Sequence, residues 1–243
     1  MRRLAQFVIA FLFCASISYA DSFSDIRTQV RRQVKDNGAT LQRYSDDFIN
    51  DLINEAQKDV VNRTWCILDA ADLTLTSKTT YYDLQSNVIA IHQAYYTNAS
   101  GDITTLDEVM ERSVRQSNPD YEDSAGDVTE YFVRQSTSDA NALEMGIRSV
   151  PASVTTESIR YHYFAQPTLL SSDSDVPFNG LEHLVAYNQI LAFYASAHIY
   201  LIEGLIQRAT SYSSTYEAGI EIMKDRIGDS PNYNRSFKSN IGR

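Results

Sequence analysis

The chain has 243 residues, of which 43% are hydrophobic and 21% charged, a composition typical of a folded protein and not of a disordered one. Its formal net charge is −10, and no run of Lys and Arg is interleaved with aromatic residues. Because an acidic surface repels a phosphate backbone, this composition argues against specific nucleic-acid binding. An acidic wall past which DNA slides without being held is compatible with the same charge.

The first 20 residues have the layout of a secretory signal. Arg2 and Arg3 come first, residues 7–15 form an apolar core, and small residues precede a cleavage position after Ala20. Spanning a bilayer takes about 20 apolar residues, so we expect no stable membrane span in this segment. An exported protein would lose these residues, whereas an uncleaved apolar segment has to be covered by protein.

The two cysteines, Cys14 and Cys66, define no disulfide framework, and no CxxC pair suggests zinc or redox chemistry. Cys14 lies within the apolar N-terminal run. Cys66 follows Trp65, and an isolated cysteine of this kind is typical of a small buried hydrophobe. We therefore expect Cys66 in the core.

The next part of the chain is predicted to be helical. Residues 21–44 form a polar extension in which a helix is predicted to end near Asn37 and Gly38. Ser45 has the character of an N-cap, with acidic residues directly after it. From there, apolar residues recur at intervals of four, which predicts an amphipathic helix to about Arg63.

Residues 73–134 carry the pattern of a small β element. Alternating apolar residues at 73–75 and 89–95 predict two strands that form a hairpin. Thr105 and Glu108 have the spacing of a capping box, which predicts a helix ending before Asn118. A third strand is predicted at 128–134.

The chain between that strand and the C-terminal helices is predicted to be mostly loop. Residues 135–157 are rich in Ser, Thr and Asp and are assigned to a loop, and a fourth strand is predicted at 158–165. In the loop that follows, Asp173 and Asp175 are interpreted as residues that position a helix, because the segment lacks the ligands of a calcium loop.

The C-terminal region is dominated by helix. Asn179 is predicted to cap a long helix that runs to Ala209 and is interrupted at 211–214. A shorter helix at 216–227 follows. Gly228 and Pro231 then end the helix, and residues 228–243 form an arm that is net +2.

Together these patterns predict an α+β, mainly α fold. It is a helical bundle with a long C-terminal helix, a small inserted antiparallel β element and an extended C-terminal arm. The predicted division is a signal-like segment at 1–20, a polar extension at 21–44, a main domain at 45–227 and an arm at 228–243.

Groups that would support catalysis are missing from the sequence. The four histidines fall on separate predicted segments or far apart on one helix, and no HExxH, GxGxxG, Walker-type or GxSxG motif occurs. Glu203, with His198 or Arg208, is interpreted as an ordinary surface arrangement. We therefore expect no enzymatic activity, no cofactor and no metal. The histidines are His92, His162, His183 and His198.

The order of these segments resembles the head-to-tail adaptor family of tailed bacteriophages. The resemblance spans about residues 45–227. It rests on an opening helix, a strand pair with a Tyr-x-Leu turn, an aromatic strand followed by an Asp-x-Pro loop, and the final helices. The corresponding segments are DFINDLINEAQKDVVNRT (47–64), DLTLTSKTTYYDLQSNVIAI (72–91), RYHYFAQPTLLSSDSDVPF (160–178), AYNQILAFYASAHIYLIEGLIQRA (186–209) and MKDRI (223–227).

The resemblance implies a structural protein of the virion neck. Family members form a ring, usually of twelve copies, beneath the portal protein, and connect it to tail or nozzle proteins. DNA passes the channel of the ring without specific binding. The C-terminal arms pack against the portal or neighbouring subunits. Here this implies an interface formed by Tyr233, Arg235, Phe237, Lys238, Ile241 and Arg243.

A second hypothesis starts from the signal-like residues 1–20, which the adaptor family does not need. It describes an exported periplasmic or surface helical protein, either ligand-binding or a hydrolase, that is cleaved after Ala20. The two hypotheses differ in the mature chain, because the adaptor is expected to retain Met1. Intact-mass measurement of the natural protein distinguishes them.

Overall fold

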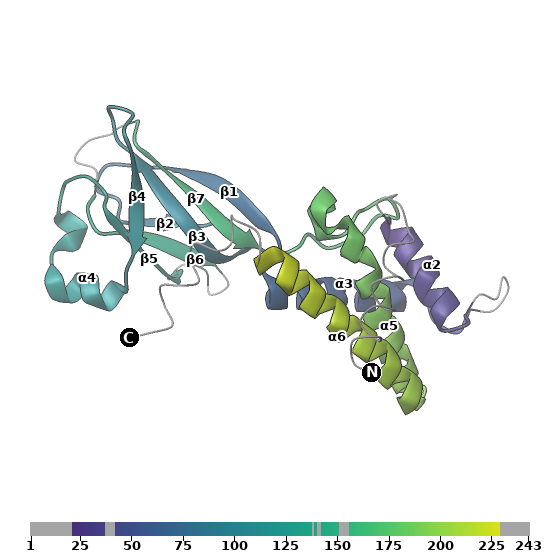
Figure 1. The fold of residues 1–243 in the computed structure, drawn as a ribbon. Helices are drawn as coiled ribbons and strands as arrows, with labels where there is room; N and C mark the ends of the chain where they lie inside the picture. The colour runs from purple at the N-terminus through teal and green to yellow at the C-terminus, as the bar shows by residue number, and fades with distance from the viewer. Residues whose placement is uncertain (1–20, 37–41, 138, 140–141, 151–155, 229–243) are drawn as a thin grey trace. The chain divides into compact units, whose positions relative to one another are not determined.

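The computed structural model describes residues 21–36, 42–137, 139, 142–150 and 156–228 (Figure 1). The chain divides into two compact units. The helical unit comprises the residues up to Ile67 together with those from Pro167 onward, and the β unit comprises Leu68–Gln166. The two are described separately below. Among the described residues, no helix is both long enough and apolar enough to cross a membrane.

The helical unit begins with two capped helices, α2 (Phe23–Gln33) and α3 (Asp46–Thr64). Ser22 and Asp25 form a capping box at the start of α2. At the start of α3, the Ser45 hydroxyl accepts a hydrogen bond from the backbone N–H of Phe48 at 3.2 Å. The prediction of the second helix and its N-cap is therefore confirmed. Trp65 ends α3 in the left-handed conformation, with φ of 50°.

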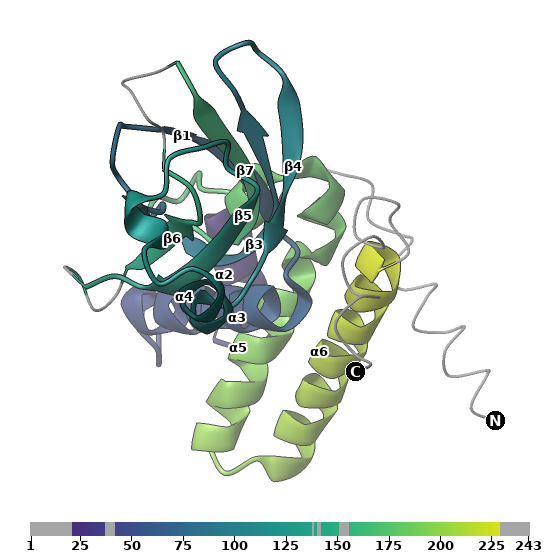
Figure 2. The same cartoon turned by 90° about the vertical axis from the view of Figure 1, so that its left-hand side faces the viewer.

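Two further helices, α5 (Asn188–Ile202) and α6 (Ile206–Gly228), form an antiparallel hairpin (Figure 2). Short 3₁₀ turns at Phe178–Gly180 and Glu182–Tyr187 precede α5. Fully buried aliphatic side chains form much of the core of this unit. They include Ile49, Ile53 and Val60 from α3 and Ile190 and Leu191 from α5.

The predicted course of the C-terminal helices is partly wrong. Asn179 has φ of 58° and lies in a 3₁₀ turn, so the α-helix starts only at Asn188. The helix breaks at Gly204, whose φ of 72° only glycine adopts at little cost. The predicted interruption at 211–214 is absent, because α6 runs through these residues and their hydroxyls bond to carbonyls four residues earlier, as Ser214 does to Thr210 at 2.9 Å.

The β unit is a seven-stranded mixed sheet with a short helix and a 3₁₀ turn (Figure 1). The strand order is β1-β7-β3-β4-β5-β6-β2; the β4–β5 pair is parallel and all other pairs are antiparallel. The elements are β1 (Leu68–Thr74), β2 (Tyr81–Asp83), β3 (Val88–Thr97), β4 (Ile103–Glu108), α4 (Glu111–Ser117), η1 (Tyr121–Asp123), β5 (Glu130–Gln135), β6 (Leu143–Ile147) and β7 (Ser158–Ala165).

This sheet contradicts the predicted fold class. The protein is not a helical bundle with a small antiparallel β element, because it contains a curled seven-stranded mixed sheet, and the residues that the structure describes are 24% strand and 44% helix. The predicted hairpin is also wrong, since β1 and β3 do not pair with each other. Each pairs with β7, which lies between them. The partner strand is far away in sequence, so local alternation gave no sign of it.

Two segments of the β unit differ from the predicted structure. The Thr105–Glu108 spacing resembles a capping box, but these residues belong to β4, which pairs with β3, and the helix starts only at Glu111. Threonine pairs well in strands, and this preference prevails here. Within the predicted loop 135–157, Leu143–Ile147 forms β6 between β5 and β2. The strand predictions at 128–134 and 158–165 are confirmed.

Candidate interaction surfaces

The most unusual surface of the helical unit is the connection between α5 and α6. Four large apolar side chains lie there, with exposed fractions of 56% for Leu201, 65% for Ile202, 41% for Leu205 and 58% for Ile206. We call these four residues the apolar turn. A cluster of this kind on a soluble protein marks a surface that another segment or protein covers.

The apolar turn is held in a defined conformation by the polar residue at its centre. The Glu203 carboxylate accepts a hydrogen bond from the Tyr44 hydroxyl at 2.8 Å and pairs with the Arg43 guanidinium at 2.5 Å. These partners replace the His198 or Arg208 considered from the sequence. The Arg208 guanidinium instead lies 5.5 Å from the centre of the Tyr200 ring. The four apolar side chains are therefore presented on a fixed scaffold.

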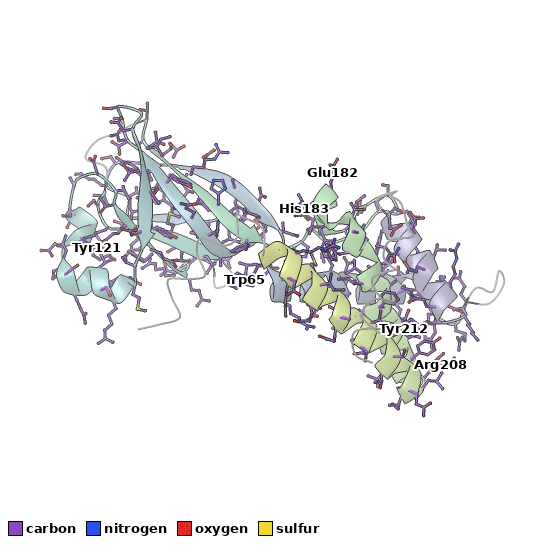
Figure 3. All side chains as sticks on the ribbon, viewed as in Figure 1. Trp65, Tyr121, Glu182, His183, Arg208 and Tyr212 are labelled. Carbon is purple, nitrogen blue, oxygen red and sulfur yellow. The ribbon has the colours of Figure 1, made fainter. Side chains whose placement is uncertain are left out.

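Aromatic contacts brace the same end of the hairpin. Figure 3 shows Arg208 and Tyr212 there, and the rings of Tyr200 and Tyr212 lie 5.4 Å apart. The Tyr200 hydroxyl donates to the backbone carbonyl of Gln33 at 2.7 Å, which attaches α5 to the end of α2.

A groove of about 730 Å³ lies beside the apolar turn, between α3, α5 and α6. In its polar wall two carboxylates share one guanidinium, because Arg63 pairs with Glu217 at 2.5 Å and with Asp59 at 3.3 Å. The hydrogen bonds from Arg63 hold the pKa of Glu217 below its usual range. Tyr216 donates to Asp59 at 2.6 Å. The charged groups of this groove are thus committed to one another and are poor candidates for acid–base catalysis.

Three of the described histidines pack against aromatic rings, and the fourth, His183, lies in the 3₁₀ turn Glu182–Tyr187. His92 is on β3, His162 on β7 and His198 on α5, with ring centroids 5.4 Å from Phe164, 5.9 Å from Tyr95 and 4.1 Å from Tyr194, respectively. Within the described part of the chain, no three His, Cys, Asp or Glu side chains are grouped in a way that could hold a metal ion.

The two aspartates of the 171–178 segment serve the start of α2. Asp175 accepts backbone N–H groups from Ser171 and Ser172 at 2.7 and 2.8 Å, and its own carbonyl accepts the N–H of Phe23 at 2.8 Å. Asp173 pairs with Arg27 at 2.5 Å. The interpretation as a helix-positioning loop fits these contacts, although the helix positioned is α2 and not the next one in sequence.

Cys66 is fully buried, as predicted. Burial raises the pKa of its thiol to about 11, so this cysteine is a poor nucleophile. The predicted interface residues of the arm, Tyr233, Arg235, Phe237, Lys238, Ile241 and Arg243, lie outside the described residues, as does the signal-like segment 1–20.

The negative charge of the protein is concentrated in the β unit. Residues 68–166 contain 15 Asp and Glu against 6 Lys and Arg, a net charge of −9 out of −10 for the chain. Several of its few cations are paired internally. Arg134 lies 3.0 Å from Glu144 and 3.5 Å from the centre of the Tyr81 ring, and Arg148 lies 2.8 Å from Glu130. The net acidity is therefore left to carboxylates at the surface.

The apolar turn was visible in the sequence but misinterpreted. The predicted long helix to Ala209 runs through LIEGLI at 201–206, although Gly204 is a common helix terminator. The charge of the β unit could not be separated from that of the chain until the unit boundaries were known.

The family model described as SU10 adaptor protein matches residues 21–236, which include all of the β unit and the described helices of the helical unit. No curated protein matches the chain.

Proposed function

Because this chain belongs to the SU10 adaptor protein family, a family of phage head-to-tail adaptors, we propose that it is a structural subunit of an adaptor ring. In this proposal the ring docks beneath the portal protein, links it to tail or nozzle proteins and lines the channel for DNA. The protein then resides in the neck of the virion. The comparison gives no support to the exported, periplasmic alternative.

The observation that carries this proposal is the extent of the family match. It covers residues 21–236 and so includes both compact units. The described residues therefore leave no additional domain that would need a separate function. A structural role also agrees with the groove, where Asp59 and Glu217 are both ion-paired with Arg63.

The charge of the β unit supports the proposed channel. With a net charge of −9, this unit repels the phosphate backbone of DNA. Such a wall permits DNA to slide without forming lasting contacts. We expect the β unit to contribute to the channel surface for this reason.

The basic arm is the proposed contact with neighbours. Arg235, Lys238 and Arg243 give it an excess of positive charge on an acidic chain, and Tyr233, Phe237 and Ile241 supply apolar anchors. In a ring of acidic subunits, usually of twelve copies in this family, each arm would lie on an acidic surface of the portal or the next copy.

The proposal is tested by measuring the mass of the assembly. The full chain is examined by mass photometry, alone and with portal rings, and a closed ring bound to portal is the expected result. Replacing Arg235 and Lys238 by Glu should weaken assembly, whereas Ser236→Ala, between them, should not. A chain that stays monomeric at all concentrations and ignores portal would refute the adaptor ring.

A further inference from the structure

We propose that the apolar turn of one copy packs into the groove between α3, α5 and α6 of the next copy, as a head-to-tail contact within the ring. This inference rests on the proposed function and names the residues through which neighbouring copies meet. The two surfaces differ, so each copy offers its turn to one neighbour and its groove to the other. Contacts of this heterologous kind build a closed ring when the rotation between copies closes.

The composition of α5 indicates that its groove face is covered. The helix Asn188–Ile202 contains no Asp, Glu, Lys or Arg. A helix that has no charged face is typically buried on all sides. One side of α5 packs in the core of the helical unit, whereas the other lines the groove with side chains at helical spacing. A partner that fills the groove would complete the burial of this helix. The lining side chains are Tyr194, Ala197, His198 and Leu201.

The apolar turn has the properties of a group that fills such a groove. Ile202 and Ile206 are each more than half exposed. The turn is held by the contacts of Glu203 with Arg43 and Tyr44, so little conformational freedom is lost when it binds. The groove, at about 730 Å³, has a volume typical of a binding pocket.

The charges of the two surfaces are complementary. Arg208 lies directly after the apolar turn, is exposed, and forms an ion pair with no described carboxylate (Figure 3). In the groove, Asp59 and Glu217 share the guanidinium of Arg63, which leaves an excess of one negative charge. A cation that arrives beside the apolar turn offsets this excess, and an arginine next to apolar anchors is a common combination in protein interfaces.

The contact is small, which suits a ring better than an isolated pair. Four apolar side chains bury much less than the about 800 Å² per partner of a stable interface. Two copies joined by one such contact should therefore dissociate readily, whereas closure of a ring makes the last contact intramolecular. We expect to detect the contact in assembled rings.

Disulfide cross-linking in rings formed with portal tests the contact. Ile206→Cys, in the turn, and Ser213→Cys, in the groove, are combined on one chain in a Cys14→Ser background. Cys66 does not interfere, because its thiol is buried. The two new cysteines are about 10 Å apart along α6, too far for a disulfide within one chain. Mild oxidation should therefore produce a ladder of covalent dimers, trimers and longer products on a denaturing gel.

The single-cysteine variants are the controls. Either cysteine alone should give at least about tenfold less cross-linked product than the pair. Dimers formed by Ile206→Cys alone would mean that two turns meet each other, which would overturn the head-to-tail contact. Rings of full mass without a ladder would also overturn it and would leave the proposed ring intact. A chain that forms no ring with portal refutes the proposed function itself, so the two failures are distinguishable.

Substitutions give a second, independent measurement. Ile206→Asp should lower the yield of rings at least about tenfold, because it carries a carboxylate into an acidic groove. Ile103→Asp, at another exposed isoleucine, is the matched control and should leave the yield unchanged. Arg208→Glu should also lower the yield, whereas Arg208→Lys, which keeps the charge, should not. Equal yields for Ile206→Asp and Ile103→Asp, with both variants folded by circular dichroism, would overturn the proposal.

Discussion

Gly146 in the β unit lies where a side chain has no room. It pairs with Phe132 across β5 and β6, and the Phe132 ring covers it. A methyl group on Gly146 would lie 2.8 Å from Phe132 Cε1 and closer still to Cζ and Cε2. The ring cannot easily move, because it packs edge-on against Tyr81 and Tyr121, at centroid distances of 6.2 and 6.1 Å.

The substitution Gly146→Ala sets two effects against each other. Alanine restricts the unfolded chain and by itself would stabilise a strand by about 0.5–1 kcal/mol. Overpacking a core usually costs about 1–3 kcal/mol, and here the clash involves a ring that is only 1% exposed. We therefore expect a net loss of about 1–2 kcal/mol in the free energy of unfolding of the β unit.

The measurement is urea unfolding followed by circular dichroism, with hydrogen exchange of the β5 and β6 amides to localise the change. Gly126→Ala is the matched control, because its added methyl would meet only Ser149, 4.0 Å away. Phe132→Leu should cost less in the Gly146→Ala background than alone, since the smaller side chain relieves the clash. Equal stability of Gly146→Ala and Gly126→Ala would refute this reasoning.

Three further predictions concern buried contacts. Gln57→Leu should destabilise the helical unit by about 1–3 kcal/mol, monitored by Trp65 fluorescence, because the Gln57 amide pairs with two backbone groups of the 167–178 segment. Gly219→Ala should loosen the α5–α6 hairpin, since its methyl would lie 2.6 Å from Ile190 Cγ2. The loss in thermal unfolding should be smaller in an Ile190→Ala background, because alanine lacks that methyl. Hydrogen bonds from the Ser136 hydroxyl and from Arg134 lower the pKa of Glu144 below its usual 4.5. The ionised Glu144 therefore stabilises the fold above pH 4.5, and this contribution is lost as the pH falls through the lowered pKa. Glu144→Gln should flatten that part of an acid titration of stability.

Each of these predictions has a control. Gln207→Leu changes an exposed glutamine on α6 and should be nearly neutral, so equal losses at positions 57 and 207 would contradict the buried hydrogen bonds. A Gly219→Ala variant more stable than the natural chain would mean that helix propensity outweighs the clash. Asp120→Asn, on the surface, should keep the acid dependence that Glu144→Gln removes.

The amino-acid sequence by itself determined the features that depend on neighbours along the chain. Ser45 and the apolar stripe after it fixed α3, because capping and helical spacing act within a few residues. The alternation at 158–165 fixed β7 for the same reason. The order of residues also indicated the adaptor resemblance and the lack of catalytic motifs. The family match agrees with the resemblance.

Only the tertiary structure decided which strands pair and which apolar residues remain outside. β7 joins β1 to β3 across about 60 residues or more, and Thr105 belongs to β4 because β3 offers it a partner. LIEGLI looks like buried helix in sequence, yet Gly204 turns the chain and leaves Leu201, Ile202, Leu205 and Ile206 exposed. The physical reason is that burial and strand pairing are set by contacts between distant segments, whereas propensity and capping are set locally.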